Sequence, residues 1–406
     1  MTAVMRGIRV IELATWGFIP SAGVALADWG AEVIKIEHPE HGDPMRGLIP
    51  SSLRSTGTHP VSFMFQTFSR GKASVGIDLT NEGGRAALLR LVETADVFLT
   101  NYLPSVRRKL GVDVADLQAV NPRLIYVKGS GLGPAGDEAD TGGFDLASYW
   151  SRGGVAHVST GPHEQWPVPM PGAAFGDLQA GLYAAGGVAA ALFNRERNDS
   201  GHVVDVSLLG AATWVMAPHI AASTMYDIDA MPRSGHEAPS NPISNTYRTS
   251  DDRYIALVML ESDRFWAPLV ELMGRSDLAV DPRFADANTR SANSTECVAE
   301  LEKIFAARPL AAWCELLSKQ RGVWAVVQTP KEVAHDPQVV ANGYVGRLDL
   351  GPGGTIGVGM PPVQFDERQP HPAPAPELGA DTDRLLQEVG YDWDRLIELK
   401  VAGAIS

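Results

Sequence analysis

Gly7-Ile8-Arg9-Val10-Ile11-Glu12-Leu13 opens the chain with a short run rich in Val and Ile, which is typical of a strand buried in a parallel sheet. Helical stretches separate this run from others like it. Strands are expected at Ile8–Leu13, Val33–Glu37, Ser74–Leu79, Val97–Asn101 and Leu124–Gly129, with helices at Ser21–Trp29, Gly84–Thr94 and Val114–Val120. This alternation predicts an α/β fold, with a Rossmann-like large domain built on a parallel sheet. No G-x-G-x-x-G follows the first strand, so a dinucleotide fingerprint is absent.

The second half of the chain predicts a smaller α+β domain. Two long helices, Leu178–Arg195 and Val206–Met225, are expected to lead out of the large domain, and a linker at Ala230–Ser244 follows them. The smaller domain would contain a hairpin of Asn245–Arg248 and Tyr254–Leu260 and helices at Asp263–Met273, Val298–Ala307 and Ala311–Gln320. A Pro-rich connection at Gln369–Pro376 then leads to a last helix at Asp381–Val389. Proline and serine mark the linker, and the short turn favours the hairpin.

The composition is compatible with a soluble enzyme. The 406 residues are enough for a large core and more than one domain, and 45% of them are hydrophobic. A formal net charge of −14 argues against a nucleic-acid or anionic-membrane partner, which would need a basic face. Cys297 and Cys314 lack metal-type spacing and are expected to be small buried hydrophobes; no metal site is expected. No leader or bilayer-spanning segment is visible, so a cytoplasmic location is expected.

The stretch Phe175-Gly176-Asp177-Leu178-Gln179-Ala180-Gly181 places a carboxylate at the start of an Ala- and Gly-rich helix. The positive end of the helix dipole would help to keep Asp177 ionised. The small residues Gly176 and Gly181 would let a large electrophile approach, and backbone N–H groups would hold an oxyanion. Taken alone, the local sequence is more typical of an aspartate that only caps the helix N-terminus.

Motifs along the whole chain resemble the family III CoA-transferases. That family includes formyl-CoA and carnitine CoA-transferases, and the α-methylacyl-CoA racemases are close relatives. The matching segments, in order, are Gly7–Leu13, Pro20, Asp28–Glu37, Gly42-Asp43, Arg46-Gly47, Lys72–Asp78, Asp96–Pro104, Leu110-Gly111, Asp177–Leu192, Asp336–Val339 and Ala375–Gly379. The ordered set, more than any single motif, carries the resemblance.

The resemblance implies a discontinuous large domain and an interlocked-ring homodimer. Residues 1–225 would form the first part of the CoA-binding domain, residues 226–330 the linker and small domain, and residues 331–406 the return to the large domain. The long Pro-rich connections are consistent with this topology.

The resemblance also implies the reaction. Its substrates would be an acyl-CoA and a free carboxylic acid, with Asp177 as the nucleophile that forms an aspartyl anhydride and then an aspartyl-CoA thioester. Coenzyme A enters as a substrate, so no metal or organic cofactor is expected.

CoA contacts are expected from basic and polar residues that match the family. These are His38, Lys72, Asn101, Arg107, Lys109 and Asp145, with Arg46 and Arg108 as neighbours. Each basic side chain has a plain alternative as a solvated surface charge. His38, Ala73 and Ser105 depart from the residues seen in some relatives, which leaves the details of phosphate contact open.

Gly143-Phe144-Asp145-Leu146 separates two possible activities. The related racemases use a histidine in a Gly-His-Asp motif for proton exchange, and this chain has Phe144 there. His157 and His163 lie nearby in sequence but do not match the motif. CoA transfer is therefore favoured over racemase chemistry, and a non-catalytic CoA-binding protein is a further alternative.

The acyl group is the least defined part of the prediction. Ser240–Ser244 has no glycine run where formyl-CoA transferase has a glycine-rich loop. Trp150, Trp166, Met170 and Phe175 are candidates for an apolar wall, although such residues are more often plain core. A medium or large apolar acyl group is expected over formyl or oxalyl.

Overall fold

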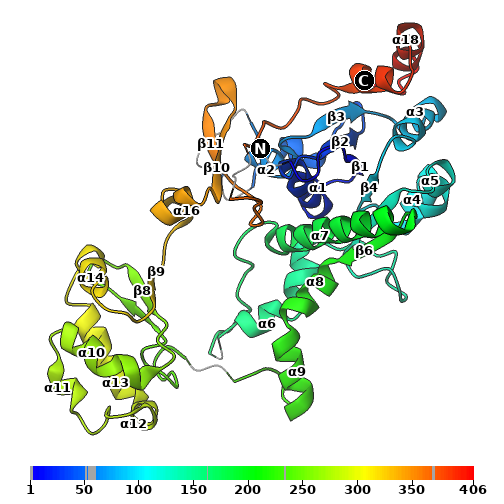
Figure 1. Ribbon diagram of the computed structural model, residues 1–406. Helices are drawn as coiled ribbons and strands as arrows, with labels where there is room; N and C mark the ends of the chain where they lie inside the picture. The colour runs from blue at the N-terminus through cyan, green and yellow to red at the C-terminus, as the bar shows by residue number, and fades with distance from the viewer. Residues whose placement is uncertain (1–2, 51–52, 54–60, 162, 233–234, 368–370) are drawn as a thin grey trace. The chain divides into compact units, whose positions relative to one another are not determined.

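The computed structural model describes residues 3–50, 53, 61–161, 163–232, 235–367 and 371–406 (Figure 1). The chain forms two compact units. The first comprises Met1–Thr160, Trp166–Ile228 and Pro337–Ser406, and the second comprises Gly161–Gln165 and Asp229–Asp336. The first unit is therefore discontinuous in sequence. Compactness alone does not define folding domains, so the three-part domain division remains a prediction. Residues 233–234 and 368–370 of the two Pro-rich connections lie outside the described residues.

A six-stranded parallel sheet forms the centre of the first unit and confirms the predicted α/β class. The strands are β1 (Arg9–Leu13), β2 (Glu32–Glu37), β3 (Ala73–Gly76), β4 (Val97–Thr100), β5 (Ile125–Ser130) and β6 (Val203–Ser207). Their order is β3-β2-β1-β4-β5-β6, so the direction of strand addition reverses between β1 and β4. In open parallel sheets, ligands bind outside the carboxyl ends of the strands at such a switch point.

Helices cover both faces of this sheet. Successive residues of a strand point to opposite faces, and in the central strands both faces carry apolar side chains that must be covered. Val10 packs in one hydrophobic core and its neighbour Ile11 in the other. The first core includes α1 (Phe18–Asp28), α7 (Phe175–Asn198) and α8 (Leu208–Val215), and the second includes α3 (Glu82–Val92), α5 (Val114–Val120), α17 (Thr382–Glu388) and α18 (Trp393–Val401). Burial on both faces explains why the central strands read as continuous apolar runs.

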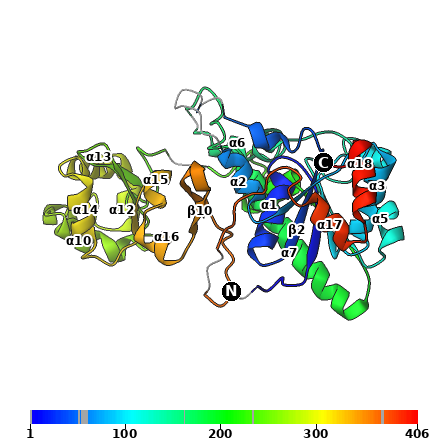
Figure 2. The same ribbon diagram turned by 90° about the horizontal axis from the view of Figure 1, so that it is seen from above.

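The C-terminal segment returns to the β3 edge of the sheet. Ile77 and Ile405 form an antiparallel bridge there, and the amide N–H of Gly76 donates to the Thr382 hydroxyl at 3.0 Å. Both ribbon views show α18 beside α3 (Figures 1 and 2). The first and last parts of the chain thus share one core.

The predicted helix over Val206–Met225 is wrong in its first part and is divided in the rest. Residues 203–207 form β6, which pairs with β5, and α8 and α9 (Ala217–Tyr226) follow it. Val203, Val204 and Val206 are β-branched and fit an edge strand. Pro218 lies in the first turn of α9, where proline is tolerated, but it could not lie inside one continuous helix without a break.

Shorter elements complete the first unit. They are η1 (Pro44–Gly47), α2 (Phe63–Ser69), α4 (Pro104–Leu110), η3 (Leu146–Ser151), α6 (Val155–Ser159), α16 (Pro337–Ala341), β10 (Val345–Asp349), η4 (Gly351–Gly353) and β11 (Thr355–Gly359). β10 and β11 form an antiparallel hairpin.

The second unit is α+β, as the sequence predicts. Its antiparallel sheet has the order β7-β8-β9, and the first two strands form the expected hairpin. The elements are β7 (Thr246–Arg248), β8 (Tyr254–Leu257), α10 (Ser262–Leu272), α11 (Ser276–Ala279), α12 (Ala287–Ala292), α13 (Ser294–Phe305), α14 (Leu310–Leu317), β9 (Trp324–Val326) and α15 (Pro330–Val333). Cys297 is buried in its core as expected, whereas Cys314 is only partly buried. Among the described helices of both units, none has the length and apolar character needed to cross a bilayer.

Candidate active site

Asp177 lies in the first turn of α7 and does not cap it. The helix begins at Phe175, and Ala174 occupies the N-cap position with a left-handed backbone (φ 64°). The interpretation of Asp177 as a plain N-cap is therefore wrong. The left-handed residue sets the angle at which the chain enters the helix, and the partly buried Asp177 side chain faces a cavity of the first unit.

Asp145 fixes the backbone beside Asp177. Its Oδ2 accepts the N–H of Gly176 at 2.9 Å and, more weakly, the N–H of Asp177 at 3.4 Å. Two N–H groups at the start of α7 are thus held by a carboxylate of the segment leading into η3. The other oxygen, Oδ1, is buried without a hydrogen-bond partner among the described residues. Asp145 therefore acts on the geometry and the electrostatics of Asp177.

Burial and the charge of Asp145 raise the pKa of Asp177 to about 7. Burial also raises the pKa of Asp145. Burial and the charge of Asp145 both oppose the ionisation of Asp177 that the start of the helix is expected to favour. A carboxylate with this pKa is about half ionised at pH 7. It is poorly solvated, which favours attack on an electrophile.

A cavity of about 310 Å³ lies in front of Asp177. Its lining residues are Thr15, Trp16, Phe18, Asn101, Tyr102, Leu103, Val106, Gly129, Ser130, Gly131, Gly142, Gly143, Phe144, Asp177 and Leu208. The lining includes the segments that follow β1, β4, β5 and β6, so the cavity is at the carboxyl ends of the strands and spans the switch point. This location is the one expected for the ligand of an open parallel sheet.

Asn101 holds the segment that follows β1. Its Oδ1 accepts the N–H of Thr15 at 3.1 Å, and its Nδ2 donates to the carbonyl of Thr15 at 2.7 Å. Trp16, the next residue, has a left-handed backbone (φ 67°), and its N–H donates to Asp43 Oδ1 at 3.4 Å. A non-glycine residue rarely adopts this conformation, and such strain persists where the surrounding contacts fix it. Asn101 thus lines the cavity and also positions an aromatic side chain there.

Lys72 lies in a buried ionic cluster and not in the cavity lining. Its Nζ donates to Glu12 Oε2 at 2.6 Å and to the carbonyl of Pro20 at 2.9 Å, and the side chain has no exposed surface. Lys35 approaches the same glutamate at 3.1 Å and donates to the carbonyl of Ala14 at 2.8 Å. Burial lowers the pKa of Lys72 to about 8 although Glu12 opposes this effect. In this geometry the two lysines brace the loop after β1, and Lys72 presents no ammonium surface to a phosphate.

The other predicted CoA contacts are spread over the carboxyl edge of the sheet. His38, after β2, is exposed and stacks on His41, with ring centroids 4.6 Å apart. Arg107 on α4 is mostly buried and donates to Asp113 Oδ1 at 3.0 Å and to the Tyr102 carbonyl at 2.7 Å. Lys109, on the same helix, is exposed. The structure therefore brings Asn101, Asp145 and Asp177 together. His38, Arg107 and Lys109 are not among the described residues that line the cavity.

The two glycines flanking Asp177 have packing roles. A Cβ on Gly176 would lie 2.3 Å from the Tyr149 ring, and one on Gly181 would lie 1.8 Å from Ser21 Oγ of α1. The N–H of Gly176 is already donated to Asp145, so it is not available to hold an oxyanion. The expectation that these glycines open a path to the nucleophile is therefore wrong. They allow α7 to approach its neighbours closely.

The aromatic residues of the cavity differ from those predicted. Trp150 is buried and donates its indole N–H to the Val168 carbonyl at 3.0 Å. Neither it nor Trp166, Met170 or Phe175 is among the lining residues, a set that instead includes Trp16. The sequence did contain a signal for Trp16. This residue lies shortly after the first predicted strand, and residues that follow the first and fourth strands meet at the switch point.

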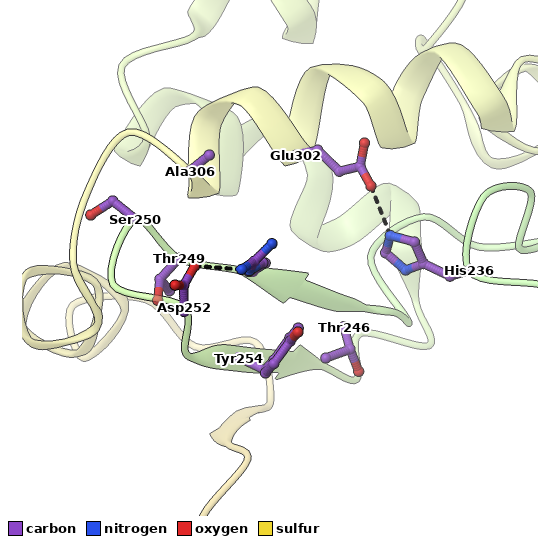
Figure 3. Close-up of a pocket in the computed structure, with 9 residues that line it drawn as sticks. His236, Thr246, Thr249, Ser250, Asp252, Tyr254, Glu302 and Ala306 are labelled. Carbon is purple, nitrogen blue, oxygen red and sulfur yellow. Dashed lines mark hydrogen bonds and ion pairs between the residues drawn. The ribbon is translucent and has the colours of Figure 1, made fainter.

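A second, larger cavity of about 760 Å³ lies within the second unit (Figure 3). It lies between β7, β8 and α13, and its polar side chains pair with one another. His236 Nε2 is 2.9 Å from Glu302 Oε1, and Arg248 forms an ion pair with Asp252 at 2.6 Å. No predicted site residue is among those that line it.

The fold and the first cavity define an α/β protein that presents one carboxylate at the switch point of a parallel sheet. The chain belongs to CoA-transferase family III, which matches residues 5–382, and it is therefore a CoA-transferase.

Individual relatives match over nearly their whole length. The cinnamoyl-CoA:phenyllactate CoA-transferase of Clostridium sporogenes is 30% identical over 98% of this chain and 96% of its own. The (R)-2-hydroxy-4-methylpentanoate CoA-transferase of Clostridioides difficile is 29% identical over 98% of both chains. The crystal structure of a CaiB/BaiF family protein from Brucella suis superimposes with a TM-score of 0.84 at 29% identity, over 96% of this chain and all of that one.

Proposed function

We propose that the protein transfers coenzyme A from an acyl-CoA to a free carboxylic acid through covalent intermediates on Asp177. A carboxylate oxygen of Asp177 attacks the thioester carbonyl, the C–S bond breaks, and CoA leaves as the thiolate from a mixed anhydride. The thiolate then attacks the Asp177 carbonyl carbon and releases the donor acid, which leaves an aspartyl-CoA thioester. The acceptor carboxylate repeats these steps in reverse. No redox change or water is involved, and CoA is the only carrier required.

The position of Asp177 is the observation that carries this proposal. Among the described residues that line a cavity at the carboxyl edge of the sheet, it is the one ionisable carboxylate, and Asp145 fixes the backbone on which it stands. A poorly solvated carboxylate facing a partly closed cavity suits nucleophilic attack on a thioester.

Isotope exchange tests this proposal. A labelled free acid should enter the pool of its own acyl-CoA in the presence of the protein, and Asp177→Ala should abolish the exchange while leaving the fold intact. Retention of near-wild-type exchange by this variant would refute the role of Asp177. A non-catalytic CoA-binding protein would bind the acyl-CoA and show no exchange in either form.

Racemase chemistry is the alternative with less support. Phe144 lines the same cavity as Asp177, at the position where the related racemases have a histidine, and the part of the lining that the structure describes includes no histidine. A phenyl ring cannot transfer a proton. Incubation with a 2-methylacyl-CoA in deuterated water should therefore leave the α-carbon unlabelled, and rapid labelling that depends on Asp177 would reverse the order of the two activities.

We also propose that the protein is a homodimer, as the family resemblance implies. None of the residues of α9 is buried, and on α8 and α9 the side chains of Trp214, Met225 and Tyr226 are 66% to 76% exposed. Apolar exposure of this extent marks an interaction surface. Sedimentation over a wide dilution range should show a dimer, and a stable folded monomer would contradict an interlocked arrangement.

A further inference from the structure

The cavity in front of Asp177 has an unusual balance of charge for a site that binds carboxylic acids. Among its described lining residues there is no Lys, Arg or His, and Asp177 is the one carboxylate. The remaining lining consists of aromatic and aliphatic side chains, small hydroxyl residues, one amide and several glycines. A second carboxylate carried by a substrate would find no positive partner here, and burying an unpaired charge is costly.

Two of the aromatic side chains that line the cavity, those of Trp16 and Phe144, contact each other. The rings of Trp16 and Phe144 pack edge to face, with centroids 5.9 Å apart and an interplanar angle of 84°. Both retain solvent-exposed surface, 38% for Trp16 and 64% for Phe144. Aromatic surface left open at a cavity gains stability when an apolar group covers it.

The position of Trp16 is fixed by the fold. Asn101 holds the preceding residue through two hydrogen bonds, and Asp43 accepts the N–H of Trp16 itself. The left-handed backbone of Trp16 is maintained by these contacts. A rigid aromatic wall loses little conformational freedom when a ligand binds.

We propose that this site selects monocarboxylic acids whose tail is apolar, uncharged and of aryl or branched-alkyl size, and that Trp16 and Phe144 are the residues that select them. This inference rests on the proposed CoA transfer and adds the substrate class. The cavity of about 310 Å³ is at the small end of small-molecule sites, which limits the tail to roughly the size of a phenyl or isobutyl group.

Identity exchange measures this selectivity for any acid, because the donor and the acceptor carry the same acyl group. Each acyl-CoA is incubated with the labelled form of its own acid, and incorporation of label is followed by mass spectrometry. The informative pair is 4-methylpentanoate and succinate, which have similar shapes but differ in a terminal isopropyl or carboxylate group. We expect kcat/KM for 4-methylpentanoate, and for 3-phenylpropanoate, to exceed that for succinate by at least about 30-fold.

Variants of Phe144 test the assignment of the wall. Phe144→Ala should lower kcat/KM for the two apolar acids by about 10-fold, and Phe144→Lys should narrow or reverse the preference over succinate by supplying a cation. Trp393→Ala removes a similarly exposed aromatic ring on α18, outside the cavity, and should change neither value.

The outcomes separate this inference from the proposed function. Succinate exchange that equals or exceeds 4-methylpentanoate exchange, and depends on Asp177, would overturn the inferred substrate class and leave the transfer mechanism standing. An unchanged preference in the Phe144→Lys variant, shown to be folded by circular dichroism, would overturn the assignment of the wall. Absence of exchange with every acid would overturn both proposals.

Discussion

Replacement of Asp177 by asparagine should stabilise the protein at neutral and alkaline pH while abolishing transfer. Asparagine has nearly the shape of a protonated aspartate but cannot ionise. Burial and the neighbouring Asp145 raise the pKa of Asp177 from 3.8 to about 7, so ionisation disfavours the folded state. Well below pH 3.8 the side chain is protonated in the folded and unfolded chains alike, and it imposes no penalty. As the pH rises toward and through 7, the wild-type protein loses stability relative to the variant.

The size of the effect follows from the pKa difference. Each pKa unit corresponds to about 1.4 kcal/mol, which gives an upper limit of about 4 kcal/mol when Asp177 is fully ionised. The side chain is only partly buried, and solvent screens its charge. We therefore expect the advantage of the variant in free energy of unfolding to reach about 2 kcal/mol by pH 8.5.

Urea unfolding of both proteins at pH 4.5, 6.5 and 8.5 measures this advantage. Asp137→Asn, in an exposed loop, controls for the loss of one negative charge from a chain of net charge −14. Its difference from wild type should stay nearly constant with pH. An Asp177→Asn advantage that is flat or that shrinks as the pH rises would show that Asp177 is not held in the poorly solvated state described above.

Four further variants test the surroundings of Asp177 and the packing of its unit. Asp145→Asn should shift the loss of transfer activity at acid pH to lower pH, because it removes a charge that helps to raise the pKa of Asp177. An unchanged pH dependence would contradict the electrostatic coupling of these two side chains. Lys72→Met should cost about 3–5 kcal/mol in urea unfolding, since it leaves Glu12 buried with one lysine fewer, and a neutral effect would argue against the buried cluster. Gly23→Ala should also destabilise the folded protein, because its Cβ would lie 1.9 Å from the buried carboxylate of Glu12. Gly186→Ala, in open space on α7, should instead stabilise the protein by about 0.5–1 kcal/mol. Similar effects of the two substitutions would contradict the packing described for Gly23.

The sequence predicts the central sheet well because of where its strands lie. Val10 and Ile11 each face a different core, so β1 is a continuous apolar run that local reading detects. The sequence does not reveal the edge strand β6, because only Ser207 separates Val206 from the apolar start of α8, where a helical period dominates. Local pattern alone cannot show that residues 203–207 pair with β5, since that pairing joins segments far apart in the chain.

The site was predictable where its features are local and unpredictable where they are long-range. The Gly-Asp sequence at the start of an Ala- and Gly-rich helix made Asp177 a candidate, and the match to the family III motifs assigned it the role of nucleophile, which stays a prediction. Its pKa depends on Asp145, 32 residues earlier, and on burial, neither of which the local sequence shows. The role of Lys72 depends in the same way on Glu12, 60 residues away on β1. A lysine in a sequence gives no sign of a buried partner at that distance.

The covalent role of Asp177 is the central claim, and trapping the intermediate tests it most directly. The protein is mixed with an acyl-CoA that supports exchange, quenched with acid and digested, and the peptide that contains Asp177 is analysed by mass spectrometry. The account predicts a mass increase equal to coenzyme A less one water on that peptide, lost on treatment with hydroxylamine and absent from Asp177→Asn. Continued exchange with an unmodified Asp177 peptide, or a CoA adduct on another residue, would contradict it.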